Sequence, residues 1–314
     1  MIINNIRDQV PVMLLYVVES TGSSPGRQGF FMATDVNGNM EGSIGGGIME
    51  HKFVEMAKDH LKIEKNERRA IDLKKQVHAK SAIKNQSGMI CSGEQTILLY
   101  VVKPADAPAI ENIIASLQEH KNGALVLSPA GIGFEPVSPE TDFTFIMRSE
   151  EDWLYKEKTG YKHQLFIIGG GHCALALSKL MRPLDFYVHV YDDRIELKTM
   201  LENESAHEKY FVNDYTDLKT LVPSGENHYV VIMTFGYRTD DMAVKALLHK
   251  HFRFIGLLGS MAKITQLLEE YRKEGISEEL LQRIHTPVGI QIKSQTPEEI
   301  AVSIAAEIIK EKNK

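Results

Sequence analysis

Two runs of three glycines are the strongest chemical signal in the sequence. The first, Gly45-Gly46-Gly47, lies in EGSIGGGIMEHKF, and the second, Gly169-Gly170-Gly171, lies in LFIIGGGHCALALSKL. Each run follows a strand-like segment and precedes a helix-like segment. Free N–H groups at the start of a helix can bind an anion, so both loops are candidate phosphate sites. The alternative for each loop is a tight structural junction without a ligand.

The second loop fits the dinucleotide-binding pattern G-x-G-x-x-A. Gly169 permits a tight turn, Gly171 lets the backbone approach a phosphate, and Ala174 lets the helix pack closely on the strand. Asp192 ends the next strand-like run, about 20 residues further on, where a carboxylate can accept a hydrogen bond from a ribose hydroxyl. Arg194 could favour a 2′-phosphate, so both NAD and NADP remain open. The other interpretation is that these glycines serve strand–helix packing alone.

Three side chains beside small residues could contact a ligand. Cys91, in GMICSGEQ, has a thiolate that could bind a metal or carry sulfur, or it is a small buried hydrophobic residue. Cys173 lies inside the second glycine motif, where a helix start favours a thiolate, but packing on the sheet is the alternative. His172 could contact a phosphate in the same loop, or serve as a cap or a solvated side chain.

Two charged residues of the first half are weaker candidates. Arg27, in the loop TGSSPGRQG, could contact an anion or be solvated. Glu50 is expected in the first turn of a helix, where it complements the helix dipole. Spacing alone reveals no Ser-His-Asp set and no metal-binding histidine pair, so catalytic residues stay unassigned.

The elements that position these residues in the first half are strands, a hairpin and two helices. Residues 12–20 are typical of a buried strand, and residues 30–44 predict a hairpin turning at Asn37-Gly38. Residues 48–63 predict an amphipathic helix. Its expected buried face consists of Phe53, Met56, Ala57, His60 and Leu61. Further strands are expected at 91–104, 123–129 and 143–148, which could complete a mixed sheet, and a helix at 107–120.

A charged segment, residues 149–163, separates the two halves and contains the only tryptophan. We expect a domain boundary there, which gives an amino-terminal domain of residues 1–155 and a carboxy-terminal domain of residues 156–314. The alternative is a solvated hairpin or surface helix within one domain.

The second half alternates short apolar strands with helical stretches. This alternation predicts a parallel sheet covered by helices, hence a Rossmann-like α/β domain behind a mixed α/β domain. The last helix should begin after Thr296, with Glu299 completing a capping box. Its stripe of Ile300, Ile304 and Ile308 should dock on the sheet.

Composition excludes several classes of protein. The chain has 314 residues and a net charge of −6 with no long basic block, which argues against nucleic-acid binding. It lacks an apolar run long enough for a membrane span, and its first residues do not resemble a signal peptide. Two cysteines are too few for a disulfide framework, so a cytoplasmic location is expected.

The ordered motifs resemble the XdhC/CoxI family, the xanthine dehydrogenase accessory factors. They are VESTGSSPGRQGFFM, GSIGGGIME, MICSGEQTILLYV, FIIGGGHCALALSKL with VYDDR, IGLLGS, and IHTPVGIQIKSQTPEEIAVSIAAEII. The resemblance covers nearly the whole chain. It implies an amino-terminal domain of its own fold and a Rossmann-like carboxy-terminal domain.

The resemblance also implies a function in the maturation of molybdenum hydroxylases. Family members bind molybdenum cofactor, protect it, and support its sulfuration and insertion into a client enzyme. A molybdenum hydroxylase client, a sulfur donor protein and a homodimer follow as expected partners. Cys91 and one glycine loop then become the candidate contacts for the metal and the phosphate of molybdopterin. The other loop could hold a nucleotide, a dinucleotide form of the cofactor, or nothing.

Some positions depart from the family pattern. Many members carry C-G-G where this chain has Cys91-Ser92-Gly93, and a histidine where it has Phe235. Many also carry basic residues directly after the later G-S, where this chain has Met261 and Ala262 before Lys263. The leading interpretation is a cofactor-handling chaperone. The alternatives are an NAD(P)-dependent oxidoreductase and a nucleotide-sensing module that use the second domain.

Overall fold

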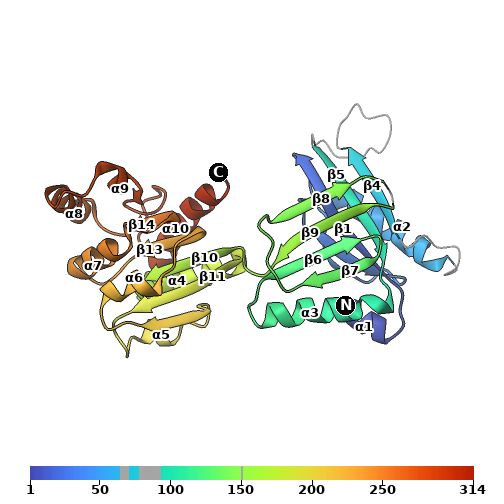
Figure 1. Cartoon of the computed structure of the whole chain (residues 1–314), viewed down its shortest axis with the longest axis horizontal. Helices are drawn as coiled ribbons and strands as arrows, with labels where there is room; N and C mark the ends of the chain where they lie inside the picture. The colour runs from blue at the N-terminus through green and yellow to red at the C-terminus, as the bar shows by residue number, and fades with distance from the viewer. Residues whose placement is uncertain (64–70, 78–92, 150) are drawn as a thin grey trace. The chain divides into compact units, whose positions relative to one another are not determined.

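The computed structural model describes residues 1–63, 71–77, 93–149 and 151–314, shown in Figure 1. The chain divides into two compact units, Met1–Gly160 and Tyr161–Lys314. The expected division after residue 155 falls inside a strand, β9 (Trp153–Thr159). None of the helices within the described ranges combines the length and the apolar character that crossing a bilayer requires.

The first unit contains an antiparallel five-stranded sheet in the order β3-β2-β1-β5-β4. Its hairpin pairs β2 with β3 as expected, and Gly38 takes a positive φ of 87° in the turn. The side chain of Asp35 holds this turn by accepting from the N–H groups of Asn37 and Asn39, each at 2.9 Å. The strands are β1 (Val12–Gly22), β2 (Phe31–Asp35), β3 (Met40–Gly42), β4 (Ile71–Val77) and β5 (Gly93–Val101).

Helix α2 (Gly47–Lys62) covers one face of this sheet. Alternate residues of a strand point to opposite faces, so Met13, Leu15 and Val17 of β1 pack toward this helix. The buried residues of α2 are Met49, Phe53, Val54, Ala57 and Leu61. Met56, which the helical periodicity placed on the buried face, is instead 39% exposed, because Met49 and Val54 fill the contact with the sheet.

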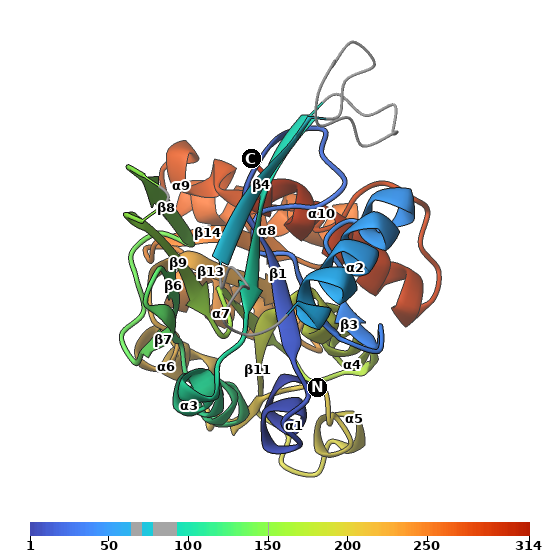
Figure 2. The same ribbon diagram turned by 90° about the vertical axis from the view of Figure 1, so that its right-hand side faces the viewer.

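A second antiparallel sheet, in the order β7-β6-β9-β8, packs on the other face of the first sheet. Leu14, Tyr16 and Val18 of β1 meet Trp153 and Tyr155 of β9 there. Figure 2 shows α2, the five-stranded sheet and the four-stranded sheet in succession. The elements are β6 (Gly123–Ser128), β7 (Gly131–Glu135), β8 (Phe143–Met147) and β9, with α1 (Ile2–Arg7), η1 (Pro104–Asp106) and α3 (Ala107–Gln118).

One expectation for the strands of this unit was wrong. The strands at 123–129 and 143–148 do not complete a mixed sheet, because they pair with β7 and β9 in a separate antiparallel sheet. The charged segment 149–163 contains the division between the two units, after Gly160, and also strand β9. In this strand Trp153 and Tyr155 are buried in the core, while the charged side chains that follow Tyr155 are only partly buried.

The second unit is a parallel six-stranded sheet in the order β12-β11-β10-β13-β14-β15. Strand β10 is central, and the chain winds outward from it in both directions, as in a Rossmann fold. The predicted parallel sheet is confirmed. The strands are β10 (His163–Ile168), β11 (Phe186–Asp192), β12 (Glu208–Phe211), β13 (Gly225–Ile232), β14 (Phe252–Leu257) and β15 (Ile284–His285).

Helices cover both faces of this sheet (Figure 1). Helix α10 docks through Ile304 and Ile308, with Ile300 partly buried, as its stripe predicted. Its start has the expected capping box, in which Thr296 Oγ accepts from the Glu299 N–H at 3.2 Å. The helices are α4 (His172–Met181), η2 (Arg182–Leu184), α5 (Lys198–Leu201), η3 (Tyr215–Asp217), α6 (Leu218–Leu221), α7 (Tyr237–Leu247), α8 (Met261–Lys273), α9 (Glu278–Gln282) and α10 (Pro297–Lys312).

Candidate functional site

The second glycine loop connects β10 to α4 at the carboxyl edge of the parallel sheet. The strand order reverses here, since β11 and β13 flank β10 on opposite sides. Gly169 has a φ of +109°, and a Cβ there would lie 2.4 Å from the carbonyl oxygen of Met233. This position therefore requires glycine for the fold itself.

The next two glycines differ from Gly169 in what surrounds them. The N–H of Gly170 donates to Asp192 Oδ2 at 2.6 Å, and its carbonyl accepts from Thr199 Oγ1 at 2.6 Å. Gly171 is the N-cap residue of α4, with a φ of −71° and no side-chain cap. A Cβ at Gly171 would meet no described atom within 4 Å. The loop is thus fixed on its inner side and open at Gly171.

Asp192 lies at the end of β11 and is fully buried. Its carboxylate accepts four hydrogen bonds, from the Gly170 N–H and from the N–H, Nε and Nη2 groups of Arg194, at 2.6 to 2.9 Å. Burial alone would raise the pKa of Asp192, but the hydrogen bonds from Arg194 and Gly170 outweigh it and lower that pKa. Because a carboxylate has about four acceptor positions, Asp192 has none left for a ribose hydroxyl.

Arg194 stands at the rim of the crevice beside the glycine loop. Asp192 holds its guanidinium from one side, while 38% of the Arg194 side chain remains exposed. The guanidinium carbon lies 5.6 Å from the centre of the Phe235 ring. Phe235 follows β13 by three residues and is 89% exposed.

The crevice at this edge of the sheet has a volume of about 730 Å³. Cys173 belongs to its lining, and burial, reinforced by the charge of Glu298, raises the pKa of the Cys173 thiol. Cys173 is therefore a neutral thiol near pH 7, and it packs against the core of the sheet, which was the alternative to a thiolate at the helix start. The lining consists of Gly171, His172, Cys173, Ala174, Leu175, Arg194, Leu197, Lys198, Thr199, Glu202, Met233, Thr234, Phe235 and Leu258.

A buried charge pair holds the backbone of Thr234, a residue of the crevice lining. Asp240 of α7 is fully buried, and its Oδ1 accepts from the Thr234 N–H at 3.0 Å. Its Oδ2 accepts from Lys263 Nζ of α8. Sequence reasoning missed this pair, because 23 residues separate its members and only the tertiary fold brings them together.

The first glycine loop holds a carboxylate of the chain itself. Gly46 and Gly47 have positive φ values of 74° and 71° and lead into α2. Glu50 Oε2 accepts from Ser43 Oγ at 2.7 Å, from the Ile44 N–H at 3.0 Å and from the Gly46 N–H at 3.1 Å. The amides that could bind a phosphate therefore already bind Glu50, a clamp that sequence reasoning treated only as a helix-dipole effect.

Two other segments lie against this loop. A Cβ at Gly45 would lie 2.5 Å from the backbone nitrogen of Gly26, and one at Gly93 would lie 2.6 Å from that of Ser24. Arg27 is held at the surface, where Nη1 donates to the Gly22 carbonyl at 2.9 Å. The structure thus brings the loop of Arg27 and the start of β5 to the first glycine loop. Cys91, the predicted metal and sulfur contact, lies outside the described residues.

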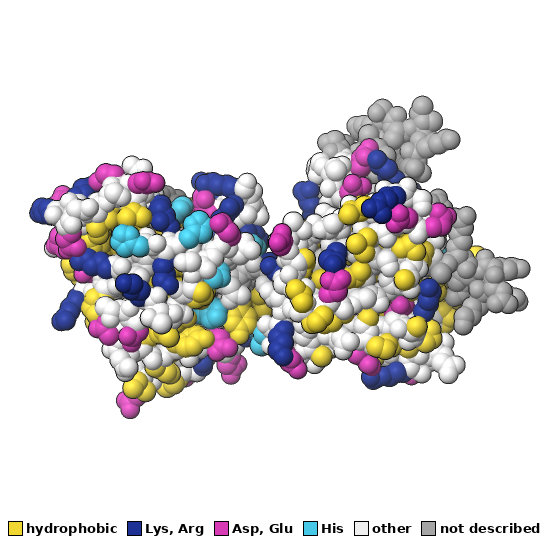
Figure 3. Space-filling model, viewed as in Figure 1, with side chains coloured by type: hydrophobic (Ala, Val, Ile, Leu, Met, Phe, Trp, Pro, Cys, Tyr) yellow, Lys and Arg dark blue, Asp and Glu magenta, His cyan; other side chains and the backbone are white. Residues whose placement is uncertain are grey.

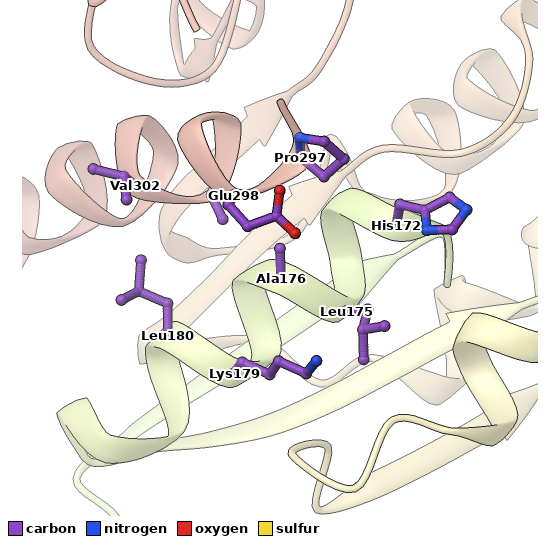
Figure 4. A pocket seen from close by; sticks show the side chains of 9 residues that line it. His172, Leu175, Ala176, Lys179, Leu180, Pro297, Glu298 and Val302 are labelled. Atoms are coloured by element: carbon purple, nitrogen blue, oxygen red, sulfur yellow. The ribbon is translucent and has the colours of Figure 1, made fainter. Parts of the chain in front are cut away.

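A groove between α4 and α10 begins at His172 (Figure 4). Its volume is about 390 Å³, and Glu298 points from α10 toward α4. Apolar side chains such as Leu175 and Val302 form much of its walls. The described residues contain no cluster of three or more His, Cys, Asp or Glu side chains that could hold a metal ion.

Histidines and aromatic residues gather on the strands of the second unit, and histidine side chains are visible on its surface in Figure 3. His189 stacks on Phe166 with ring centres 4.6 Å apart, and its Nε2 lies 2.7 Å from Gln164 Oε1. Burial, followed by the charges of His207 and His228, lowers the pKa of His189 to about 4. His189 is therefore a neutral side chain at physiological pH.

Known proteins match both units. Residues 165–308 match the XdhC Rossmann domain, and residues 6–72 match the XdhC and CoxI family. The Escherichia coli protein named "Uncharacterized protein YqeB" is 30% identical over 162 residues, which cover 49% of this chain and 28% of that protein. A Bacillus subtilis protein, named as a probable subunit of xanthine dehydrogenase, is 35% identical over 79 residues, which cover 25% of this chain and 22% of that one.

The chain thus matches less than a third of the length of either curated relative. A solved structure, described as a xanthine dehydrogenase from Bacillus halodurans, superposes with a TM-score of 0.71. The superposition covers 99% of this chain and 95% of that one at 20% identity. It shows that the two chains share a fold.

Proposed function

The chain belongs to the XdhC and CoxI family, and from this we propose that it is an accessory factor for a molybdenum hydroxylase. It would bind molybdenum cofactor as cargo and assist the sulfuration of the cofactor and its insertion into a xanthine dehydrogenase-type client. The observation that carries this proposal is the match of both units to one family, at residues 6–72 and 165–308.

The relatives support the choice of client. The Bacillus subtilis protein is named as a probable part of xanthine dehydrogenase, and the superposed structure is described as a xanthine dehydrogenase. Both names connect chains of this kind with that enzyme system.

The first glycine loop has the chemistry to hold the phosphate of the cargo. Its seated Glu50 carboxylate shows that the N–H groups of Ile44 and Gly46, with the hydroxyl of Ser43, can surround an oxyanion. A phosphate would bind there by exchange with Glu50. Arg27 lies on an adjoining loop, and its contact with the Gly22 carbonyl uses one of the five N–H donors of its guanidinium.

The cargo supplies the metal centre that the client needs, and the chain has to bind and release it. Cys91 is our proposed sulfur contact to the metal, because a cysteine thiolate is a soft ligand. In the sequence, Cys91 precedes Gly93 of this site by two residues. In this proposal Cys173 has no such function, since it is half-buried against the sheet of the second unit.

The direct test uses these two cysteines as a matched pair. The full chain and its Cys91→Ala and Cys173→Ala variants are loaded with molybdenum cofactor, and molybdenum per chain is measured. Activation of a client apoenzyme is the second measurement. We expect Cys91→Ala to lose retention or activation while Cys173→Ala keeps both. Full loading and activation by Cys91→Ala would refute this site, and no loading of any form would refute the proposed function.

An NAD(P)-dependent oxidoreductase is the second candidate, and a nucleotide-sensing module fits the same observation. Both draw on the glycine loop that opens into a crevice at the reversal of strand order. Oxidation of NADPH or NADH by the full chain, followed by absorbance, separates turnover from binding alone.

A further inference from the structure

The crevice of the second unit has features that neither the fold nor cargo handling requires. Gly169 must be glycine because Met233 lies against it, but Gly171 has open space where a side chain would project. With an ordinary φ of −71° and no steric neighbour, Gly171 could carry a side chain without strain, and glycine is only one of several residues favoured at an N-cap. The open direction at Gly171 suits a ligand that approaches the backbone at the start of α4.

The acidic position that ordinarily recognises ribose cannot do so here. Asp192 is fully buried, and all its acceptor positions are filled by Gly170 and Arg194. The next carboxylate, Asp193, accepts from the Tyr215 hydroxyl at 3.2 Å and lies 3.9 Å from Arg194 Nε. Its side chain is 37% exposed but does not contribute to the lining that contains Arg194. A free ribose 2′-hydroxyl therefore meets an arginine rather than a carboxylate at this point of the rim.

Arg194 is prepared to receive an anion. Two of its five guanidinium N–H groups donate to Asp192, through Nε and Nη2 at 2.8 Å each. The remaining donors belong to a side chain that is 38% exposed at the crevice. Because Asp192 fixes the guanidinium plane, little side-chain freedom is lost when a phosphate binds bidentately.

Phe235 supplies a surface for a planar ring beside this arginine. Its side chain is 89% exposed, which is unusual for phenylalanine, and it belongs to the crevice lining after β13. One side of the ring faces Arg194, with 5.6 Å from guanidinium carbon to ring centre. An aromatic ring and a guanidinium are the two groups on which a purine stacks well.

We infer that the crevice binds an adenine nucleotide that carries a 2′-phosphate, as in NADP. The pyrophosphate lies at the open Gly171 and the start of α4, the 2′-phosphate on Arg194, and the adenine against Phe235. Arg194 and Phe235 thus determine specificity, while Asp192 positions Arg194. This inference rests on the second candidate function, nucleotide binding in this crevice, and adds the identity of the nucleotide. It requires neither molybdenum nor a client enzyme.

The test is calorimetric titration of the full chain, free of cargo, with 2′,5′-ADP and with ADP. Charge-assisted hydrogen bonds to Arg194 should make 2′,5′-ADP bind about tenfold tighter or more. NADP should likewise bind more tightly than NAD. Equal affinity of the two probes, tighter binding of ADP, or no binding of either would overturn the inference.

Variants assign the preference to residues. Arg194→Ala should remove most of the advantage of 2′,5′-ADP over ADP, while Arg182→Ala should leave it unchanged, since Arg182 donates to the Glu204 carbonyl elsewhere. Phe235→Ala should weaken both probes by a similar factor without affecting the fold, because its ring is exposed. Gly171→Val should abolish binding of both. Retained preference in Arg194→Ala, or unchanged affinity in Phe235→Ala, would contradict the assignment.

The two proposals can fail separately. A chain that retains molybdenum and activates its client but binds no adenine nucleotide would refute this inference and leave the accessory function standing. A chain that prefers 2′,5′-ADP but never retains molybdenum would refute the accessory function and leave this inference standing.

Discussion

At the scale of single residues, one carboxylate of the chain binds backbone N–H groups in each of the two glycine loops. All acceptor positions of Asp192 are used by hydrogen bonds from Gly170 and Arg194, and Glu50 accepts hydrogen bonds from backbone N–H groups of the first glycine loop. Their effects differ. Asp192 is buried and locks its loop, whereas Glu50 is only partly buried, and our proposal has it exchange with the phosphate of the cargo.

Asp192→Asn should destabilise the second unit by about 2–4 kcal/mol at pH 7, since it breaks a buried charged pair whose arginine is partly solvated. The folded-state pKa of Asp192 is depressed, so its stabilisation is full above the unfolded pKa of about 3.9 and is lost as pH falls through the folded value. Urea unfolding at pH 7 and below pH 4 measures both. A difference between wild type and variant that stays constant down to pH 3 would contradict this role.

Glu50→Gln should slow the release of bound cofactor about three- to tenfold, because a neutral amide competes less well for the loop N–H groups. The release rate of molybdenum during dialysis is the measurement. Glu55→Gln is the matched control, since Glu55 lies on the same helix and pairs with Lys58 instead of the loop. Faster release from a folded Glu50→Gln chain would show that Glu50 supports the site rather than competing with the cargo.

The same two residues show how far sequence reasoning reaches. The G-x-G-x-x-A spacing located Gly169, Gly171 and Asp192 at one edge of the sheet, where the structure has them. It could not show that Asp192 turns inward, because that depends on the Arg194 backbone and side chain folding back around it. The hydrogen bonds of Glu50 could not be predicted for the same reason, since they form only when the first turn of α2 brings Glu50 back to Ser43.

At the scale of elements, sequence patterns with one clear periodicity predicted the structure, whereas segments with conflicting signals did not. The capping box and isoleucine stripe of α10 are local signals, and both are present. Strand β9 carries charges next to Trp153 and Tyr155, so its composition indicated a boundary while its alternation indicated a strand. Separation of the first unit into two sheets depends on pairing between distant strands, which local pattern does not encode.

Strand β11 also places a neutral histidine inside the sheet. The pKa of His189 is about 4 in the folded chain and about 6.5 when unfolded, so the unfolded chain binds more protons between these values. The contribution of neutral His189 to the free energy of unfolding is therefore full above pH 6.5 and is lost as pH falls toward 4. The titratable and polar groups that face His189 include His207, His228, Tyr187, Tyr210 and Gln164.

We therefore expect the second unit to lose about 1–2 kcal/mol of unfolding free energy from this group between pH 7 and pH 5. His189→Gln should be less stable at pH 7 but should lose less on acidification, since it keeps a donor toward Gln164 and cannot titrate. His249→Gln is the control, since His249 is exposed in the turn that follows α7. Equal pH dependence in wild type and both variants would contradict the assignment of the shift to His189.

At the scale of the whole molecule, the chain joins two units whose glycine loops differ in structure. The first unit presents a loop whose oxyanion position is filled by its own Glu50, and the second presents a crevice with an uncapped helix start. The two triple glycines are therefore not equivalent. We assign cargo to the first and a nucleotide to the second.

The most direct test of the cofactor-handling account is native mass spectrometry of the full chain. The chain is purified from a molybdenum-replete host and from a host that cannot make the cofactor. We predict an adduct with the mass of molybdenum cofactor only in the first preparation, and its loss from the Cys91→Ala variant. A bare chain from both hosts, or an adenine dinucleotide as the sole adduct from both, would contradict the account.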